Sequence, residues 1–308
     1  MKKIISIIIL IIILDFVIGS SLKYLYNNTG GGIIYSLNRA FYNADEKIII
    51  LGNSRALHHF NPAIITKNTN RTCFNYGVDG GHSILLHYSE LFMITQRYSP
   101  DLIILEFSPV DFFKYSIDYE NLKVMLPYFK LNPEVDKIIL MKSPNEKIKF
   151  LSKIYPYNSC IYDYFAQHFK KVNNTILLSG FDPLDAFIDT NNTANTITTN
   201  DNHPEIDSNK VVTFQKFVKI CTEKKIHLLI INSPLFKYEK DINYTVGKNI
   251  LMENIKNGDI KFIDYSNDNN FSDYPGNFAD FTHLNSKGAK YYSEMISSVI
   301  SEFLEERK

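Results

Sequence analysis

The segment Lys47-Ile48-Ile49-Ile50-Leu51-Gly52-Asn53-Ser54-Arg55 decides the fold class of this chain. Its apolar run is typical of a strand that is buried on both faces of a parallel sheet. The run ends at Gly52, and the small polar residue Ser54 follows at once. Either Ser54 caps the next helix, or it is a nucleophile displayed at the end of a strand.

The same alternation continues along the chain. We expect strands at 47–52, 73–76, 102–107, 226–231 and 260–263. We expect helices from Ser54 with a break at Pro62, and at 82–97, 209–224 and 285–305. Near-continuous apolar strands that are separated by amphipathic helices predict an α/β fold, a three-layer sandwich with a central parallel sheet.

The chain begins with a long apolar segment. Lys2 and Lys3 precede it, and it continues to Tyr26, which gives the roughly 20 residues that a helix needs to cross a bilayer. We expect residues 1–26 to be an uncleaved transmembrane anchor with its N-terminus in the cytoplasm, because lysines precede it. The alternative is a signal peptide cleaved near Gly19-Ser20-Ser21. Both interpretations place the remaining chain outside the cytoplasm, in the periplasm or at the cell surface.

Asp15 interrupts the apolar segment. An ionisable side chain within a bilayer costs free energy unless it is paired or protonated. Asp15 therefore either contacts a polar group of a membrane partner or lies near the outer edge of the membrane.

Two further regions follow the anchor, and the second of them contains an insertion. Residues 27–44, with the run Gly30-Gly31-Gly32, are interpreted as a linker and lead-in, and residues 45–308 as the α/β domain. Residues 112–208 interrupt the strand–helix rhythm, and we expect them to form a helical insertion over one edge of the sheet.

Composition excludes several function classes. The net charge is zero and charges are interspersed, so nucleic acid is not an expected partner. The three cysteines are far apart and form no CxxC pair, which favours neither a disulfide framework nor a metal site. The sequence contains no phosphate-binding or dinucleotide-binding glycine motif. We expect no cofactor and no metal.

Polar stretches follow the predicted strands where reactive groups gather in open parallel sheets, at the strands' carboxyl ends. Three of them are Gly52-Asn53-Ser54-Arg55, residues 75–81 and residues 106–111; a fourth, residues 280–285, precedes the last helix. A serine hydroxyl becomes a nucleophile when an imidazole takes its proton and a carboxylate fixes the imidazole. Ser54, His283 and Asp280 supply these groups, and the backbone N–H groups of Ser54 and of the loop 77–81 are candidate oxyanion donors.

The motifs "GNS" at 52–54, "NYGVDG" at 75–80 and "DFTHLNSKGA" at 280–289 resemble the SGNH/GDSL hydrolase superfamily. The resemblance covers residues 45–110 and 209–305 and implies a flavodoxin-like fold. It also implies the roles of four residues. These are Ser54 as nucleophile and oxyanion donor, Gly80 as oxyanion donor, Asp280 as orienting carboxylate and His283 as base.

The third motif of that superfamily departs from the pattern. "LEFSPVD", residues 105–111, places Val110 where the superfamily has an oxyanion asparagine. Loss of one such donor costs roughly 100- to 1000-fold in rate. Asn53, Asn75 and Asn232 are the candidate substitutes.

Other polar residues have structural as well as functional interpretations. Arg55 either binds a substrate anion or holds the site by a salt bridge, with Glu106 and Asp111 as candidate anchors. His58 and His59 are interpreted as surface or pocket-lining residues rather than metal ligands, because neighbours on a helix point in different directions.

The N-terminal anchor and the Gly-x-Ser-Arg form also resemble a divergent branch that acts beside membrane-bound O-acyltransferases. That branch includes the teichoic-acid D-alanylation protein D and the alginate O-acetylation proteins. The sequence thus predicts a bacterial serine esterase or O-acyltransferase that acts on ester-linked acyl groups, acetyl above all, of an extracytoplasmic envelope glycan. Its expected partners are that polysaccharide or another acylated glycan, the membrane and a membrane-bound O-acyltransferase.

The alternative function is a non-catalytic, membrane-anchored protein that binds glycan or assembles with an acyltransferase. Val110 favours this alternative, whereas Ser54, Asp280 and His283 favour the enzyme.

Overall fold

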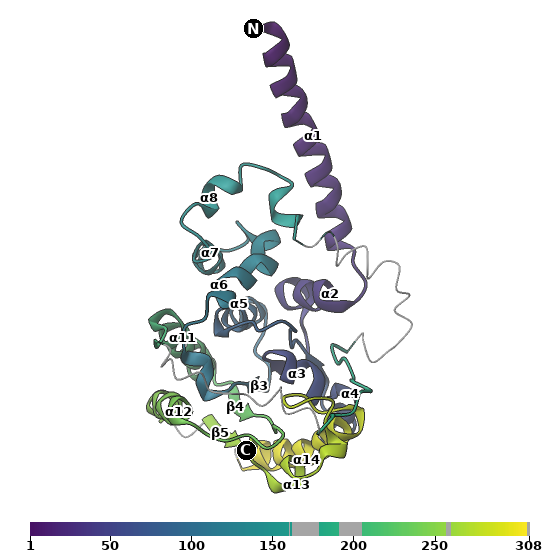
Figure 1. The fold of residues 1–308 in the computed structure, drawn as a ribbon, viewed down its shortest axis with the longest axis vertical. Coiled ribbons are helices and arrows are strands. Elements are labelled where there is room, and N and C mark those ends of the chain that lie inside the picture. Colours follow the sequence, from purple (N-terminus) through teal and green to yellow (C-terminus); the bar gives the residue numbers. More distant parts are fainter. Residues whose placement is uncertain (160, 162–178, 191–204, 257–259, 307–308) are drawn as a thin grey trace.

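The computed structural model describes residues 1–159, 161, 179–190, 205–256 and 260–306 (Figure 1). A five-stranded sheet lies at its centre, with strand order β2-β1-β3-β4-β5 and every neighbouring pair parallel. The strands are β1 (Ile48–Leu51), β2 (Cys73–Asn75), β3 (Leu102–Glu106), β4 (His227–Asn232) and β5 (Ile260–Asp264). All five predicted strands are confirmed, and their order is that of flavodoxin-like folds.

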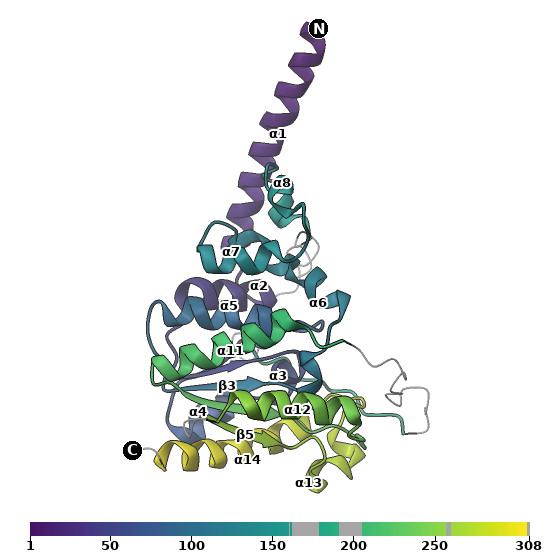
Figure 2. The same ribbon diagram turned by 90° about the vertical axis from the view of Figure 1, so that its left-hand side faces the viewer.

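Helices cover both faces of the sheet (Figure 2). Those of the α/β domain are α3 (Ser54–His59), α4 (Pro62–Thr69), α5 (Ile84–Thr95), η2 (Pro109–Phe112), α11 (Ser208–Glu223), α12 (Ile242–Asn254), α13 (Asn269–Ser272), η6 (Pro275–Asn277) and α14 (Ser286–Glu305). The break at Pro62 is confirmed, because Asn61 caps α4 and Pro62 is its first residue. Helix α12 is an addition to the predicted helices.

Alternation along the strands divides the core into two layers. Ile49 and Leu51 of β1 pack with α5, α11 and α12, whereas Ile48 and Ile50 pack with α4 and α14. Successive side chains of a strand point to opposite faces, so four apolar residues in a row require cover on both sides. The three-layer sandwich is confirmed.

The N-terminal helix α1 (Lys2–Asn27) extends away from the domain (Figures 1 and 2). An 18-residue window within it has a mean hydropathy of 2.7, and the helix is long and apolar enough to cross a membrane. The chain after it is helical as well, in α2 (Gly32–Asn38) and η1 (Arg39–Asn43). Ile34, Leu37 and Phe41 of these helices are buried in the core, so the lead-in is part of the domain.

The insertion packs only partly as predicted, because residues 179–180 lie against the edge strand β2 whereas its helices lie elsewhere. Its described helices are α6 (Ser116–Glu120), η3 (Asn121–Tyr128), α7 (Pro133–Leu140), α8 (Glu146–Lys149) and η4 (Tyr155–Tyr157). They lie between α5 and α1, and not over an edge of the sheet (Figure 2). Met125 and Ile139 are fully buried in the core layer on the α5 side, which explains this position. The helical piece predicted at 162–171 lies outside the described residues.

Asp15 finds its polar partners within the chain. Its carboxylate accepts hydrogen bonds from the Ser152 hydroxyl and from the backbone N–H groups of Lys153 and Ile154. A membrane partner is therefore not needed to satisfy Asp15.

Candidate active site

Ser54 follows the inner strand β1 of the sheet. The chain leaves β1 through Gly52, whose φ is +148° and whose added Cβ would lie 2.7 Å from the Cβ of Glu106. Only glycine fits this turn. Asn53 then occupies the N-cap position of α3, and Ser54 is the first helical residue. The interpretation of Ser54 as the helix cap is therefore wrong.

The side chains of Ser54, His283 and Asp280 form a continuous hydrogen-bonded chain. The Nε2 atom of His283 lies 2.8 Å from the Oγ atom of Ser54, and its Nδ1 atom lies 2.8 Å from Oδ2 of Asp280. Because ionised Asp280 only accepts hydrogen bonds, the proton of neutral His283 is assigned to Nδ1. Nε2 is then free to accept the hydroxyl proton of Ser54.

The loop before α14 fixes the Asp280 carboxylate. Its Oδ1 atom accepts from the backbone N–H groups of Thr282, at 2.7 Å, and His283, at 2.9 Å. Burial opposes ionisation of Asp280, but the hydrogen bonds of His283 and Thr282 outweigh it and hold the pKa of Asp280 well below its usual value. Asp280 is therefore a carboxylate at neutral pH.

Two neighbouring histidines pack against His283. The rings of His58 and His59 lie edge-on to it, at centroid distances of 5.3 and 6.3 Å. Nε2 of His59 accepts from the backbone N–H of Leu284, and Nδ1 of His58 lies 2.6 Å from the carbonyl oxygen of Asp182. Both histidines are buried beside His283, so the surface alternative of the prediction is wrong. They support the loop that carries His283.

Arg55 forms a buried ion pair. Its guanidinium lies 3.0 Å from Oε1 of Glu106 and donates to Oδ1 of Asn232. Burial raises the pKa of Glu106, and Arg55 opposes that shift. The salt-bridge interpretation of Arg55 is thus confirmed for Glu106, whereas Asp111 instead accepts from the backbone N–H of Ser108.

Two of the candidate substitutes for the oxyanion asparagine are already occupied. The fully buried Asn75 donates to the carbonyl oxygens of Ala56 and Phe60 and accepts from the backbone N–H of Gly77. Asn232 accepts from Arg55 and donates to a carboxylate oxygen of β5. Asn75 thus joins the end of β2 to α3, and Asn232 joins the ends of β4 and β5.

Gly80 lies in an exposed turn with a φ of +97°. Its backbone N–H donates to Oδ1 of Asp79 at 2.7 Å, and its carbonyl oxygen accepts from Asn121 of η3. The predicted oxyanion donor is therefore engaged by its neighbour in this structure. Val110 is partly exposed in η2, after the end of β3.

Asn53 belongs to a buried polar chain that the sequence motifs do not reveal. Its Oδ1 atom lies 3.4 Å from Nε2 of His87, and Nδ1 of His87 lies 3.0 Å from Oε2 of Glu90. Burial lowers the pKa of His87 to about 4 and raises that of Glu90 well above its usual value. Burial thus favours the neutral form of both groups, and in these forms Glu90 donates to Nδ1 of His87 and Nε2 of His87 donates to Oδ1 of Asn53.

Because Oδ1 of Asn53 accepts from His87, the N–H groups on Nδ2 of Asn53 remain available as donors. Within the described part of the chain, Nδ2 of Asn53 has no hydrogen-bond partner, and it is not sealed from solvent. His87 and Glu90 lie three residues apart on α5, a spacing that places them on one helix face. The spacing alone does not distinguish them from ordinary buried or surface residues.

The described end of the insertion passes beside the site. The backbone N–H of Asp182 donates to Leu57 of α3, and the backbone N–H of Ser286, at the start of α14, donates to Leu184. Phe181 is buried in the core layer below α3. The segment 181–188 thus borders both elements that supply Ser54 and His283. Among the described residues, no group of three or more His, Cys, Asp or Glu side chains is placed to hold a metal ion.

Comparisons with known proteins give little beyond this geometry. A family model without a stated function matches residues 182–305, which include Asp280 and His283 but not Ser54. No curated protein matches the chain. An acetyl xylan esterase of known structure is 12% identical, with a TM-score of 0.38, over 82% of this chain and 99% of its own. A likeness of this size does not identify a function.

Proposed function

We propose that this chain is a serine esterase or O-acyltransferase with Ser54 as nucleophile, His283 as general base and acid, and Asp280 as the carboxylate that orients His283. The hydrogen bond between Ser54 Oγ and His283 Nε2, 2.8 Å long and made across 229 residues of sequence, carries the proposal. A serine and a histidine with purely local capping roles have no need of this contact.

The first half-reaction transfers the acyl group to the enzyme. The Oγ atom of Ser54 attacks the carbonyl carbon of the ester while its proton passes to Nε2 of His283. As the bond between that carbon and the leaving oxygen breaks, the leaving alkoxide takes the proton from Nε2. The products are the free alcohol and an acyl-Ser54 ester.

The second half-reaction reverses the proton movement. A hydroxyl gives its proton to Nε2 of His283, and its oxygen bonds to the acyl carbon. Ser54 Oγ then leaves and recovers the proton. Water as acceptor gives hydrolysis, and a sugar hydroxyl gives transfer.

Asn53 is our candidate for the missing oxyanion donor. The amides of Asn75 and Asn232 are occupied, whereas Nδ2 of Asn53 is free and directly precedes the nucleophile in sequence. His87 donates to Oδ1 of Asn53, and this contact turns Nδ2 away from α5. The backbone N–H of Ser54, at the uncapped start of α3, is the second donor.

The substrate class follows from the expected location. Helix α1 is apolar enough to span a membrane, and we expect its N-terminus in the cytoplasm because Lys2 and Lys3 stand at its start. The domain then faces the periplasm or the cell surface, where acylated envelope glycans, with acetyl esters above all, are the substrate class. A membrane-bound O-acyltransferase is the corresponding acyl donor if the reaction is transfer.

A second candidate is a non-catalytic glycan-binding or assembly protein. Val110 in place of the oxyanion asparagine and the engaged N–H of Gly80 favour it. The two candidates differ in whether Ser54 reacts.

A fluorophosphonate probe distinguishes them. We expect the wild-type protein to be labelled, Ser54→Ala to lose labelling entirely and His283→Ala to lose most of it. Ser298→Ala is the matched control, because Ser298 is exposed on α14, and it should label as the wild type does. In cells that lack the protein, Ser54→Ala should fail to restore acylation or deacylation of the envelope glycan. Full restoration by Ser54→Ala, with no labelling of the wild type, would establish the assembly protein instead.

A further inference from the structure

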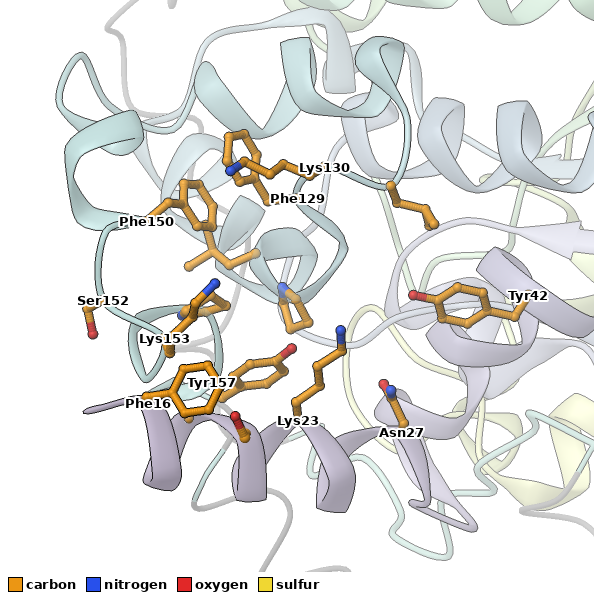
Figure 3. Close-up of a pocket in the computed structure, with 16 residues that line it drawn as sticks. Phe16, Lys23, Asn27, Tyr42, Phe129, Lys130, Phe150, Ser152, Lys153 and Tyr157 are labelled. Carbon is orange, nitrogen blue, oxygen red and sulfur yellow. The ribbon is translucent and has the colours of Figure 1, made fainter. Parts of the chain in front are cut away.

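A cavity of 460 Å³ lies between α1 and the insertion (Figures 1 and 3). None of its described lining residues belongs to α3 or to the loop 280–285, which carry Ser54 and His283. Residues of the second half of α1 form one wall, and residues 126–131 and 150–157 of the insertion form the other. The walls are held together closely. Asp15 accepts hydrogen bonds from residues 152–154, and an added Cβ at Gly19 would lie 2.4 Å from the carbonyl carbon of Lys153.

Positive charge gathers around this cavity. Among the described residues that line it, Lys23, Lys130 and Lys153 are basic and none is acidic. The ion pairs of the described chain use other lysines. Lys23 points from α1 into the space between helix and insertion (Figure 3). The nearby carboxylates of Asp15 and Asp136 are occupied by backbone N–H groups of the insertion.

The remaining lining is largely apolar and aromatic. Phe129 and Phe150 stack at 3.8 Å on the insertion side, and Phe16 faces the cavity from α1 (Figure 3). Beside them, Ile148 and Leu151 are 66% and 83% exposed. Such a patch beside an apolar helix is suited to contact with lipid.

The length of α1 sets the depth of this patch. The insertion first meets the helix at Asp15, so the apolar residues 4–14 lie before this contact, about 17 Å of helix at about 1.5 Å per residue. A bilayer's hydrocarbon core is about 30 Å thick. The helix therefore needs the stretch beyond Asp15 to complete its crossing, and the tip of the insertion enters the bilayer beside it. Lys23, about 29 Å of helix beyond Ile4, then lies at headgroup depth.

We propose that this cavity binds the headgroup of an anionic membrane lipid from the leaflet on the domain's side. Lys23, Lys130 and Lys153 contact the phosphate oxygens, and the acyl chains lie along α1 and the aromatic wall. A soluble phosphate would use the lysines alone, whereas a lipid also uses the apolar surface that continues from the cavity to α1. This lipid site is independent of the chemistry at Ser54.

The absence of tryptophan from the chain makes a direct test possible. Phe150→Trp places a single fluorophore in the cavity wall, and Leu131→Trp is a second reporter in case the first variant does not fold. Ile7→Trp, on the exposed part of α1, reports bulk lipid. The full chain is reconstituted in vesicles of phosphatidylcholine and phosphatidylglycerol in which one lipid at a time is brominated.

We expect brominated phosphatidylglycerol to quench Phe150→Trp more strongly than its mole fraction in the vesicle predicts. Each brominated lipid should quench Ile7→Trp in proportion to its mole fraction. Replacing Lys23, Lys130 and Lys153 by Gln should weaken the preference about fivefold per lysine. The control replaces the exposed Lys67, Lys224 and Lys290 by Gln, which changes the net charge equally, and should keep the preference. Equal quenching by both lipids, or loss of the preference in the control, would overturn the proposal. Displacement of the lipid by inorganic phosphate, against chloride of matched ionic strength, would show a soluble-phosphate site instead.

Discussion

The Nε2 atom of His283 lies 2.8 Å from the Oγ atom of Ser54, although Ser54 follows strand β1 and His283 precedes the last helix, α14. The two elements are brought together because α14 packs against α3 and α4 on one face of the sheet. His59 of α3 strengthens this link by accepting from the backbone N–H of Leu284. The relative position of the two reactive groups is thus fixed by core packing.

Asp280→Asn tests the carboxylate behind His283. Asparagine keeps the size of the side chain but presents an amide that favours the wrong tautomer of the imidazole, so we expect labelling of Ser54 to slow by on the order of 10³- to 10⁴-fold. Thr282→Val, which removes a hydroxyl that donates to the same carboxylate and lies 3.0 Å from Nδ1 of His283, should have a much smaller effect because Asp280 remains in place. The measurement is the rate of phosphonate labelling. Equal effects of the two variants would contradict the assigned role of Asp280.

Asn53→Ala tests the proposed oxyanion donor. Loss of one donor should slow acyl transfer on the order of 10²- to 10³-fold, with kcat affected and KM nearly unchanged. His87→Leu, which removes the group that orients Asn53, should lower kcat in the same direction but less. Introducing a donor by Val110→Asn should recover part of the loss in Asn53→Ala. Unchanged kcat in Asn53→Ala would exclude it as a donor.

Arg55→Ala should destabilise the fold by about 3–5 kcal/mol, because it leaves the fully buried Glu106 without its cation. Burial already raises the pKa of Glu106. Without Arg55 that pKa rises further, so the variant should lose stability as pH rises above the ordinary glutamate pKa of about 4.5. The double variant Arg55→Ala/Glu106→Gln should lose this pH dependence. Urea unfolding in detergent at pH 5 and pH 8 measures both effects, and an equal loss at the two pH values would contradict the assignment.

His82 gives a pH dependence of the opposite sign. Burial lowers its pKa to about 3, against an ordinary value of about 6.5. As pH falls below 6.5, the unfolded chain takes up a proton that folded His82 does not, so stability falls. His82→Gln should reduce this slope by about 1.4 kcal/mol per pH unit between pH 6 and pH 4. An unchanged slope in denaturant titrations over this range would show that His82 is already protonated in the fold.

The orientation of α1 is tested by reporter fusions. A reporter joined after residue 40 should be active only if it is a protein that works outside the cytoplasm, because Lys2 and Lys3 retain the N-terminus inside. Activity of a cytoplasmic reporter at this position would reverse the topology. Replacing both lysines by Gln should increase the fraction of inverted chains.

The sequence alone determined the central sheet and the order of the motifs. Four apolar residues in a row at Ile48–Leu51 require cover on both faces, and the polar stretches after such strands are bound to meet at one edge. Local chemistry was also readable, since Asp280 and His283 are close enough in sequence to meet within one loop. Helix α12 was less readable, because its residues Ile242–Asn254 mix apolar and polar side chains without a clear stripe.

Tertiary structure decided what the remaining polar residues do. The sequence does not distinguish Asn53 from Asn75 and Asn232. In the fold, however, the amide of Asn75 donates to Ala56 and that of Asn232 to Asp264, and of the three only Asn53 keeps a free N–H group. The burial that favours the neutral forms of His87 and Glu90 comes from packing of α5 against the sheet. Likewise, the lysine-lined cavity exists because the insertion folds back onto α1 at Asp15. Hydrogen bonds and burial depend on neighbours that are distant in the chain, so no local pattern specifies them.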